Sequence, residues 1–295
     1  MGDWVLGVIG GSGLYEIEGL KNPRWTRIDS PFGEASDEVM TGTLGDVRLV
    51  FLPRHGRGHP LPPSALNARA NIDVLKRAGC TDLISLSAVG SLREALEPGT
   101  FVVVDQFIDR TFAREKSFFG PGLVAHVSMA EPVCPRLSAM ALAAGRAAGA
   151  RMVSGGCYLA MEGPQFSTRA ESALYRSWGC DVIGMTNMPE AKLAREAELP
   201  YASVAMVTDY DCWREDDAHV EVTHILEVLN RNAAAARALV KHLAASLPLS
   251  RDASPIDTAL DGAIITAPSA RDPALAAKLS AVAGRALNPA PRTPA

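Results

Sequence analysis

The sequence alternates short apolar runs with longer stretches of helical spacing, and this alternation limits the possible folds more than any other feature. Apolar runs of strand length occupy Val5–Ile9, Val47–Leu52, Asp82–Ser87, Phe101–Val104, Asp181–Met185 and Ala202–Val207. Helical spacing is found in Ser64–Ala78, Pro135–Ala148, Thr168–Trp178, Pro189–Glu196 and Val220–Ala245. Buried strands that alternate with helices are typical of a largely parallel sheet. We therefore expect an α/β fold.

The length and composition allow one large α/β domain with a tail. The chain has 295 residues, of which 47% are hydrophobic, enough for a sizeable core. A polar, proline-containing break at residues 250–255 predicts a main domain over residues 1–249 and a C-terminal extension over residues 250–295. The extension contains a helix candidate at Pro273–Ala286, and its proline-rich end is expected to be disordered.

Charge and cysteine content argue against several classes of function. A net charge of −4 and a pI near 5.9 do not fit a general nucleic-acid binder, which needs a basic face. No apolar stretch approaches the roughly 20 residues of a membrane span, and the first residues lack the basic segment of a signal peptide. The five cysteines form no CxxC pair. We expect a cytoplasmic protein without nucleic-acid or membrane partners and without a zinc site.

Two acids follow the last apolar run, in the segment Thr208-Asp209-Tyr210-Asp211-Cys212-Trp213. Because side chains alternate along a strand, the carboxylates of Asp209 and Asp211 are expected to point the same way. Ligands of α/β proteins bind at the carboxyl ends of strands. This pair suits either a metal ion or a base that carries amino and ring-nitrogen groups.

Two further strand ends carry residues suited to an anion. Gly10-Gly11-Ser12-Gly13 lacks the third glycine of a dinucleotide loop and the lysine of a Walker loop. It fits either a cradle for one small anion or a plain tight turn. After the second strand, Arg54 offers a planar fork for phosphate, beside His55. A metal site at His55 and His59 is disfavoured, because the intervening glycines make a helix improbable.

The remaining candidates are weaker one by one. Hydroxyls of Ser85 and Ser87 precede a predicted glycine turn and could complete an anion site, although ordinary turn chemistry explains them as well. Phe166 lies in a rigid turn before a capping box at Thr168–Glu171. It could stack on a base or belong to the core. Clustering of all these segments at strand ends predicts one shared crevice.

The ordered motifs resemble one family. They are Ile9–Leu14, Pro53–Gly56, Ser87–Arg93, Asp105–Arg110, Met129–Pro135, Glu162–Glu171, Gly184–Glu190 and Thr208–Trp213. Over roughly residues 4–246, the chain is similar to the trimeric purine nucleoside phosphorylases, in their methylthioadenosine phosphorylase branch. The resemblance implies a central mixed, partly curled β-sheet flanked by helices, and a homotrimer whose sites are shared between subunits.

The resemblance also implies a reaction. Phosphate attacks the anomeric carbon of S-methyl-5'-thioadenosine and releases adenine and 5-methylthioribose 1-phosphate, which makes the enzyme a pentosyltransferase. Its partners are a small-molecule nucleoside and phosphate, and it needs no cofactor or metal. Asp209, kept protonated by burial and by the nearby Asp211, would donate a proton to the leaving base.

Roles for individual residues follow from the matched motifs. Phosphate would be held by Ser12, Arg54, His55, Ser87, Ala88 and Thr186. The nucleoside would meet Phe166 and Ser167 at the base, the Met185 backbone at the ribose, His126 and Val222 at the 5' group, and the catalytic Asp209 and Asp211 at the adenine edge. The family often has threonine at the position of Ser12, and the tail after Ser250 is longer than in the animal enzymes.

Four alternatives differ in chemistry. A phosphorylase for adenosine or for 6-oxopurine nucleosides is the nearest, but the 6-oxopurine enzymes of the family carry Glu at the position of Ser167 and Asn at that of Asp209. A nucleosidase would not need Arg54 and His55. A metal-dependent nucleotide-sugar glycosyltransferase would use Asp209 and Asp211 as metal ligands. A non-catalytic nucleoside-binding protein would be expected to have lost part of the anion set.

Overall fold

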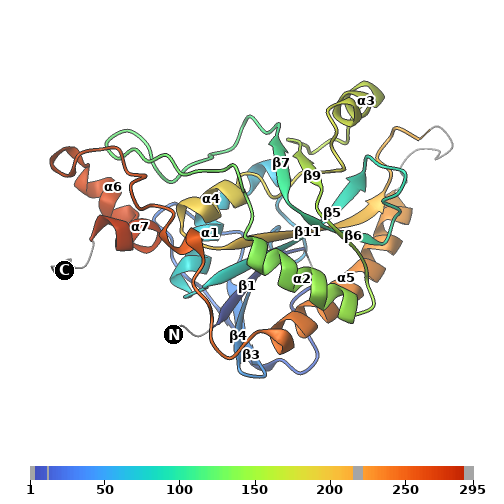
Figure 1. Cartoon of the computed structure of the whole chain (residues 1–295), viewed down its shortest axis with the longest axis horizontal. Coiled ribbons are helices and arrows are strands. Elements are labelled where there is room, and N and C mark those ends of the chain that lie inside the picture. Colours follow the sequence, from blue (N-terminus) through green and yellow to red (C-terminus); the bar gives the residue numbers. More distant parts are fainter. Residues whose placement is uncertain (1–3, 12, 215–221, 289–295) are drawn as a thin grey trace.

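The computed structural model describes residues 4–11, 13–214 and 222–288, apart from the side chains of residues 222–226. A twisted sheet occupies the centre of the molecule, and helices cover both of its faces (Figure 1). The predicted α/β fold with a mixed, partly curled sheet is confirmed. No helix in the described part of the chain is long and apolar enough to cross a membrane.

The described residues form a single sheet of 11 strands. The strands are β1 (Val5–Gly10), β2 (Lys21–Thr26), β3 (Val39–Leu44), β4 (Val47–Pro53), β5 (Asp82–Ser91), β6 (Thr100–Val104), β7 (Gln106–Asp109), β8 (Arg151–Ser154), β9 (Cys157–Ala160), β10 (Val182–Gly184) and β11 (Tyr201–Asp209). One path runs β2-β3-β4-β1-β5-β10-β9-β7, while β11 pairs with β5 and leads to β6 and β8. Because β5 pairs with β1, β10 and β11, the sheet divides there and curls.

β5 continues to Ser91, so the predicted glycine turn around Gly90 is wrong. A Cβ atom on Gly90 would lie 3.1 Å from the Asp209 Oδ1 atom and 3.2 Å from the Ile183 side chain. Glycine is therefore needed for the close approach of β10 and β11 to β5. Gly90 therefore marks close packing of β10 and β11 against the end of β5.

Helices cover both faces of the sheet. They are α1 (Ala68–Arg77), α2 (Pro135–Ala147), α3 (Arg169–Ser177), α4 (Glu190–Glu196), α5 (Val222–Ser246), α6 (Pro273–Lys278) and α7 (Ser280–Leu287). α1, α4 and α7 bury apolar side chains such as Leu75 and Leu193 in one core. α2 and α5 bury Leu137 and Leu239 in a second core on the opposite face. The alternating faces of β1 and β4 contribute to both cores.

Most helix boundaries agree with the sequence pattern, and the differences have local causes. The capping box of Thr168 and Glu171 is confirmed at the start of α3. α1 begins later than expected, because the Asn67 side chain caps it by accepting a hydrogen bond from the Ala70 amide (3.1 Å). The single helix expected at Pro273–Ala286 is wrong: α6 and α7 meet at the fully buried Leu279.

Five strands have no counterpart in the sequence predictions: β2, β3, β7, β8 and β9. β2 shows why. Its sequence, KNPRWT, has no alternating apolar pattern, because it is a mostly exposed edge strand that pairs only with β3. Periodicity finds buried strands and overlooks edge strands of this kind.

The C-terminal segment is joined to the rest of the chain by ion pairs. Asp82 is fully buried and pairs with Arg136 and Arg251, and Glu198 pairs with Arg285 at 2.5 Å. Backbone hydrogen bonds also connect the tail to the loop that carries His126, including His126 N–H to the Ala263 carbonyl (2.9 Å). The division at residue 250 stays a prediction. The proline-rich end, residues 289–295, lies outside the described residues.

Candidate active site

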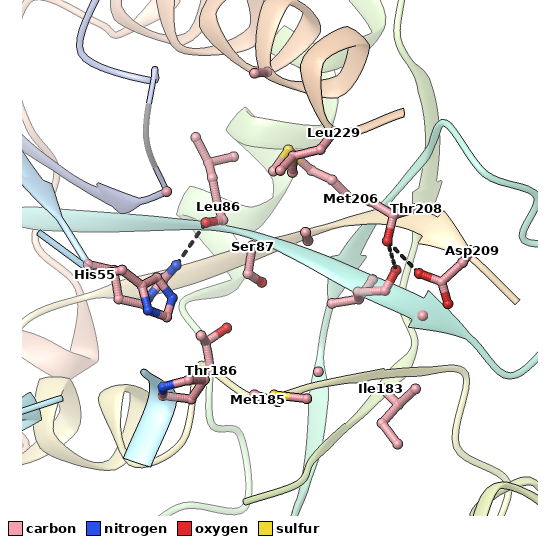
Figure 2. Close-up of a pocket in the computed structure, with 18 of the residues that line it drawn as sticks. His55, Leu86, Ser87, Ile183, Met185, Thr186, Met206, Thr208, Asp209 and Leu229 are labelled. Atoms are coloured by element: carbon pink, nitrogen blue, oxygen red, sulfur yellow. Dashed lines mark hydrogen bonds between the residues drawn. The ribbon is translucent and has the colours of Figure 1, made fainter. Parts of the chain in front are cut away.

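A cavity of about 400 Å³ opens where β1, β4, β5 and β11 end. It brings together most of the residues named from the sequence: Arg54, His55, Ser87, Ala88, Phe166, Met185, Thr186, Asp209 and Asp211. Figure 2 shows His55 and Thr186 at one end and Asp209 at the other, with Ser87 between them. The expectation of one shared crevice is thus met in the geometry.

Arg54 is 1% exposed, and the protein itself uses most of its hydrogen-bonding capacity. Its Nε and Nη2 atoms form a bidentate pair with Glu190, the latter at 3.1 Å. Nη2 also donates to Ser85 Oγ (2.6 Å), and Nη1 donates to the Leu86 carbonyl (3.0 Å). A guanidinium has five N–H groups. These contacts leave one N–H of Nη1 for a ligand.

Glu190 was not singled out from the sequence, although it ends one of the matched motifs. It is 4% exposed and neutralises Arg54. Among the described residues that line the cavity, Arg54 is the single arginine or lysine. An anion in this end of the cavity would therefore be held mainly by neutral hydrogen-bond donors.

Ser85 is not part of the cavity lining, which corrects the expectation that its hydroxyl completes an anion site. Its Oγ atom contacts Arg54, Glu190 (3.3 Å) and Asn187 Oδ1 (3.1 Å). These contacts make it a support for the guanidinium.

Ser87 differs from Ser85 in having an unsatisfied hydroxyl. Ser87 is 4% exposed and lines the cavity, yet its Oγ atom has no hydrogen-bond partner. The nearby Tyr158 has a pKa that is raised mainly by burial, and the Ser87 hydroxyl opposes that rise. The Tyr158 hydroxyl forms its hydrogen bond with Thr186 Oγ1 (3.3 Å). An unpaired buried donor is costly unless a ligand satisfies it. Ser87 thus marks a polar ligand site.

His55 is present as the neutral imidazole. Burial, followed by the charge of Arg54, lowers its pKa to about 4. Its Nδ1 atom lies 2.9 Å from the Leu61 carbonyl, which can only accept, so Nδ1 carries the proton and Nε2 is an acceptor. Its ring stacks on His59, with 4.2 Å between the ring centres and 8° between the planes.

Asp209 and Asp211 both line the cavity, for a different reason than strand alternation. β11 ends at Asp209, and Asp211 lies beyond it in a left-handed conformation with φ of 56°. The Asp211 amide donates to Asp209 Oδ1 (2.8 Å), which turns the chain so that both carboxyls reach the cavity. Burial raises the pKa of Asp211, and the neighbouring Asp209 carboxyl adds to the rise.

Thr208 connects Asp209 to β5. Its hydroxyl lies 3.1 Å from the Val89 carbonyl and 2.7 Å from Asp209 Oδ2, and Figure 2 marks the contact with Asp209 by a dashed line. A hydroxyl has one proton, and a carbonyl oxygen can only accept. When Asp209 is ionised, the Thr208 hydroxyl has two acceptors for its single proton, whereas a proton on Asp209 Oδ2 would give each contact a donor of its own.

The end of the cavity that holds Asp209 and Asp211 is more open. Phe166 is 59% exposed and lines the cavity, so it is not a core residue. Ser167 is 9% exposed, and its carbonyl accepts a hydrogen bond from Cys212 Sγ (3.2 Å). Apolar side chains that the sequence did not indicate, including Met206 and Leu229, close the side formed by β11 and α5 (Figure 2).

Four residues named from the sequence are not placed at this cavity. Ser167 is not part of its lining. Ser12 lies outside the described residues, and so does the side chain of Val222, the first residue of α5. His126 lines a separate hollow of about 420 Å³, together with residues such as Lys116, Lys192 and Glu196. Within one chain, His126 does not contact the cavity. The described residues include no cluster of three or more histidines, cysteines or acids that could hold a metal ion.

Comparisons with known proteins agree on one family. The model of the phosphorylase superfamily matches residues 5–245. A protein of Cereibacter sphaeroides named S-methyl-5'-thioadenosine phosphorylase is 61% identical over 285 residues, which cover 96% of this chain and 98% of that protein.

Solved structures show the same similarity. A methylthioadenosine phosphorylase from an Antarctic soil metagenomic library superimposes with a TM-score of 0.90 at 44% identity, covering 96% of this chain and 99% of that one. A methylthioadenosine phosphorylase of Schistosoma mansoni in complex with adenine superimposes with a TM-score of 0.76 at 36% identity, covering 96% and 98%.

Proposed function

Because the chain belongs to the phosphorylase superfamily, we propose that it cleaves the N-glycosidic bond of S-methyl-5'-thioadenosine with phosphate. The products are adenine and 5-methylthioribose 1-phosphate. The observation that carries this proposal is one cavity with the unused donors of Arg54 and Ser87 at one end and two acids, of which Asp211 is buried, at the other. Cleavage of this bond needs both, because positive charge develops on the sugar and negative charge on the leaving purine.

The phosphate is expected to lie beneath the sugar, at the end formed by Arg54, Ser87 and Thr186. One Arg54 N–H and the Ser87 hydroxyl supply donors that the protein leaves unused. The acceptor Nε2 of His55 suits a phosphate oxygen that still carries a proton. In this position the anion acts as nucleophile and as countercharge to the sugar cation.

The purine is expected between Phe166 and the acid pair. The proton held by Asp209 would pass to a ring nitrogen of the leaving base, and Thr208 would share this proton until the base arrives. Asp211 would accept a hydrogen bond from the exocyclic amine of adenine. General acid catalysis of this kind contributes on the order of 10²–10⁴ in rate.

The alternatives are weighed by the same geometry. A 6-oxopurine presents an acceptor where adenine presents a donor, and it would face the Asp211 carboxyl without a partner. Adenosine differs from methylthioadenosine only at the 5' position. Within one chain, His126 lines a separate hollow and does not close the cavity at that position. A metal-dependent glycosyltransferase would leave the unsatisfied Ser87 unexplained. We propose catalysis without metal or organic cofactor.

The shared site of a homotrimer is part of the proposal. Exposed apolar side chains at Phe112 (81%) and Ile265 (64%) leave surface for a neighbouring subunit to cover. His126 would then reach the 5' end of a neighbour's cavity. Light scattering should give about three times the chain mass of 31.2 kDa. A fully active monomer would contradict shared sites. The cytoplasmic location also stays a proposal, supported by the five free cysteines.

One assay tests the central proposal. Adenine release is measured from methylthioadenosine, adenosine and methylthioinosine, with and without phosphate, and with and without EDTA. We expect release that requires phosphate, ignores EDTA and favours methylthioadenosine over adenosine by at least roughly tenfold in kcat/KM. Full turnover without phosphate would overturn the phosphorylase reaction, and loss of activity with EDTA would restore the metal alternative.

A further inference from the structure

Arg114 lies outside the cavity lining, yet it contacts two of the segments that form the lining. Its Nη1 atom donates to the carbonyls of Met185 (2.8 Å) and Met188 (2.7 Å). Its Nη2 atom donates to the carbonyls of Glu162 (2.7 Å) and Met161 (3.4 Å), and Nε donates to the Glu162 carboxylate (3.0 Å). All five N–H groups are used, and none is left for substrate.

The two segments joined in this way carry different parts of the site. Met161 and Glu162 follow β9 and lead to Phe166, at the base end. Met185 begins the turn that contains Thr186, at the phosphate end. A single side chain, 7% exposed, thus holds the spacing between the two segments.

The turn from Met185 to Met188 needs such support. Asn187 has a left-handed backbone with φ of 68°, a conformation that few residues with a Cβ atom adopt. The Asn187 side chain bonds to Ser203 and Ser85. The described side-chain contacts to the carbonyls of Met185 and Met188 come from Arg114.

Glu162 connects the same arginine to a third segment. Its carboxylate accepts hydrogen bonds from the amides of Phe112 (2.7 Å) and Ala113 (3.1 Å). Burial raises the pKa of Glu162, but these amides and Arg114 outweigh burial and leave it lowered. A charged Glu162 keeps Arg114 and its loop in place.

We propose that Arg114 is a positioning residue for the reaction: it fixes the turn of Met185 and Thr186 relative to the Phe166 segment, so that sugar, phosphate and base are held in one reactive geometry. This inference rests on the proposed function for its catalytic consequence. The geometric part, that Arg114 orders the turn, does not depend on the substrate.

The test compares Arg114→Ala and Arg114→Lys with the full-length wild-type enzyme. A misplacement of about 1 Å costs on the order of 100-fold in rate, so we expect Arg114→Ala to lose roughly that factor in kcat/KM for methylthioadenosine. The kcat/KM of Arg114→Lys should lie between those of Arg114→Ala and the wild type, because an ammonium has three donors instead of five. Added guanidinium, below the concentration that unfolds the protein, should restore part of the Arg114→Ala activity.

Arg77→Ala is the matched control. Arg77 also pairs with a buried carboxylate, that of Asp73 (2.6 Å), but neither residue lines the cavity. This variant should lose thermal stability while keeping its kcat/KM at temperatures where it is folded. Amide hydrogen exchange gives a readout that does not depend on activity: exchange at residues 184–189 should rise in Arg114→Ala and not in Arg77→Ala.

Two results would overturn the inference. One is a folded Arg114→Ala enzyme with wild-type kcat/KM. The other is unchanged amide exchange at residues 184–189. A wild-type enzyme that releases no adenine would instead reject the proposed function, and the exchange data would still decide whether Arg114 orders the turn.

Discussion

The two ends of the cavity differ in how deeply their side chains are buried and in how their charges are compensated. The end where we propose that phosphate binds is made of buried, charge-compensated side chains: Arg54 is 1% exposed, its charge is neutralised by Glu190, and Ser85 accepts a hydrogen bond from it. The end where we propose that the base binds lies at the turn after β11 and beside Phe166, which is 59% exposed. There the chain places two acids close together, and the pKa of Asp211 is raised.

This difference separates two tasks. A phosphate ion is the same in every phosphorolysis, so rigid, charge-compensated donors serve it well. A base differs between substrates, and its recognition depends on where single protons lie. We infer that the phosphate end determines whether phosphate is used, while the base end determines which purine leaves. The following predictions would break or sharpen that division.

The largest effect is expected for Asp209→Asn. The change keeps the shape and removes the acidic proton, so kcat should fall on the order of 10²–10⁴, while the KM for phosphate stays near the wild-type value. Steady-state kinetics with each substrate varied will show this. A large rise in the phosphate KM would mean that the two ends are not separate.

Adding Ser167→Glu to Asp209→Asn tests recognition of the base. Cleavage of methylthioadenosine should weaken, and cleavage of methylthioinosine should rise, because the acceptor and donor pattern is reversed. The alternative is that the acids only cap a turn, as the bond from the Asp211 amide to Asp209 allows. A folded double variant with an unchanged substrate ratio would favour that alternative.

The next largest effect concerns Glu190→Gln. Removing one partner of a buried ion pair typically costs about 3–5 kcal/mol, and Arg54 would be left with an uncompensated charge. Bound phosphate can replace that charge, so phosphate should raise the Tm of Glu190→Gln more than that of the wild type. Differential scanning calorimetry with and without phosphate measures this.

Glu198→Gln is the control for that experiment. Glu198 is 5% exposed and pairs with Arg285, in a region that does not line the cavity. The Glu198→Gln variant should lose stability, and phosphate should raise its Tm no more than it raises that of the wild type. Equal recovery in the two variants would mean that phosphate does not bind next to Arg54.

A smaller effect is expected for the pH dependence of stability through His55. Its folded pKa is about 4, below the ordinary value of 6.5, so the unfolded chain binds the proton more readily. The contribution is therefore fully present above pH 6.5 and is lost as the pH falls toward 4, to a total of about 3 kcal/mol. The free energy of unfolding of the wild type minus that of His55→Gln isolates this group, because the other groups titrate in both proteins. A flat difference would contradict a neutral, buried His55.

The smallest effect is expected for Ser87→Ala. Its hydroxyl has no partner, so its removal should leave the free energy of unfolding unchanged or slightly higher. The KM for phosphate should rise about tenfold, the value of one hydrogen bond to a charged group. Ser91→Ala, on the same strand, should instead lower the free energy of unfolding and leave the phosphate KM unchanged, because Ser91 donates to the Arg93 carbonyl (2.7 Å). Loss of stability in Ser87→Ala would show that the hydroxyl has a structural partner.

Much of the fold follows from local patterns in the chain. The buried strands around Val5–Ile9 and Ala202–Val207, the helix after Pro135 and the capping box at Thr168 all follow from periodicity and capping chemistry that act over a few residues. The candidate residues at the strand ends also follow, because parallel strands bring their carboxyl ends to one edge. These predictions need no information on distant contacts.

Other features depend on contacts between residues far apart in the chain, and only the tertiary structure decides them. Arg54 is matched by Glu190, 136 residues later, so that its charge is neutralised and one donor remains. Gly90 continues a strand because Asp209 and Ile183 pack against it. Local sequence cannot specify which hydrogen-bonding groups are already satisfied, because that depends on every group packed around them. For this reason the order of motifs along the sequence indicated the candidate site residues, and the tertiary packing decided which of their polar atoms are free to bind a ligand.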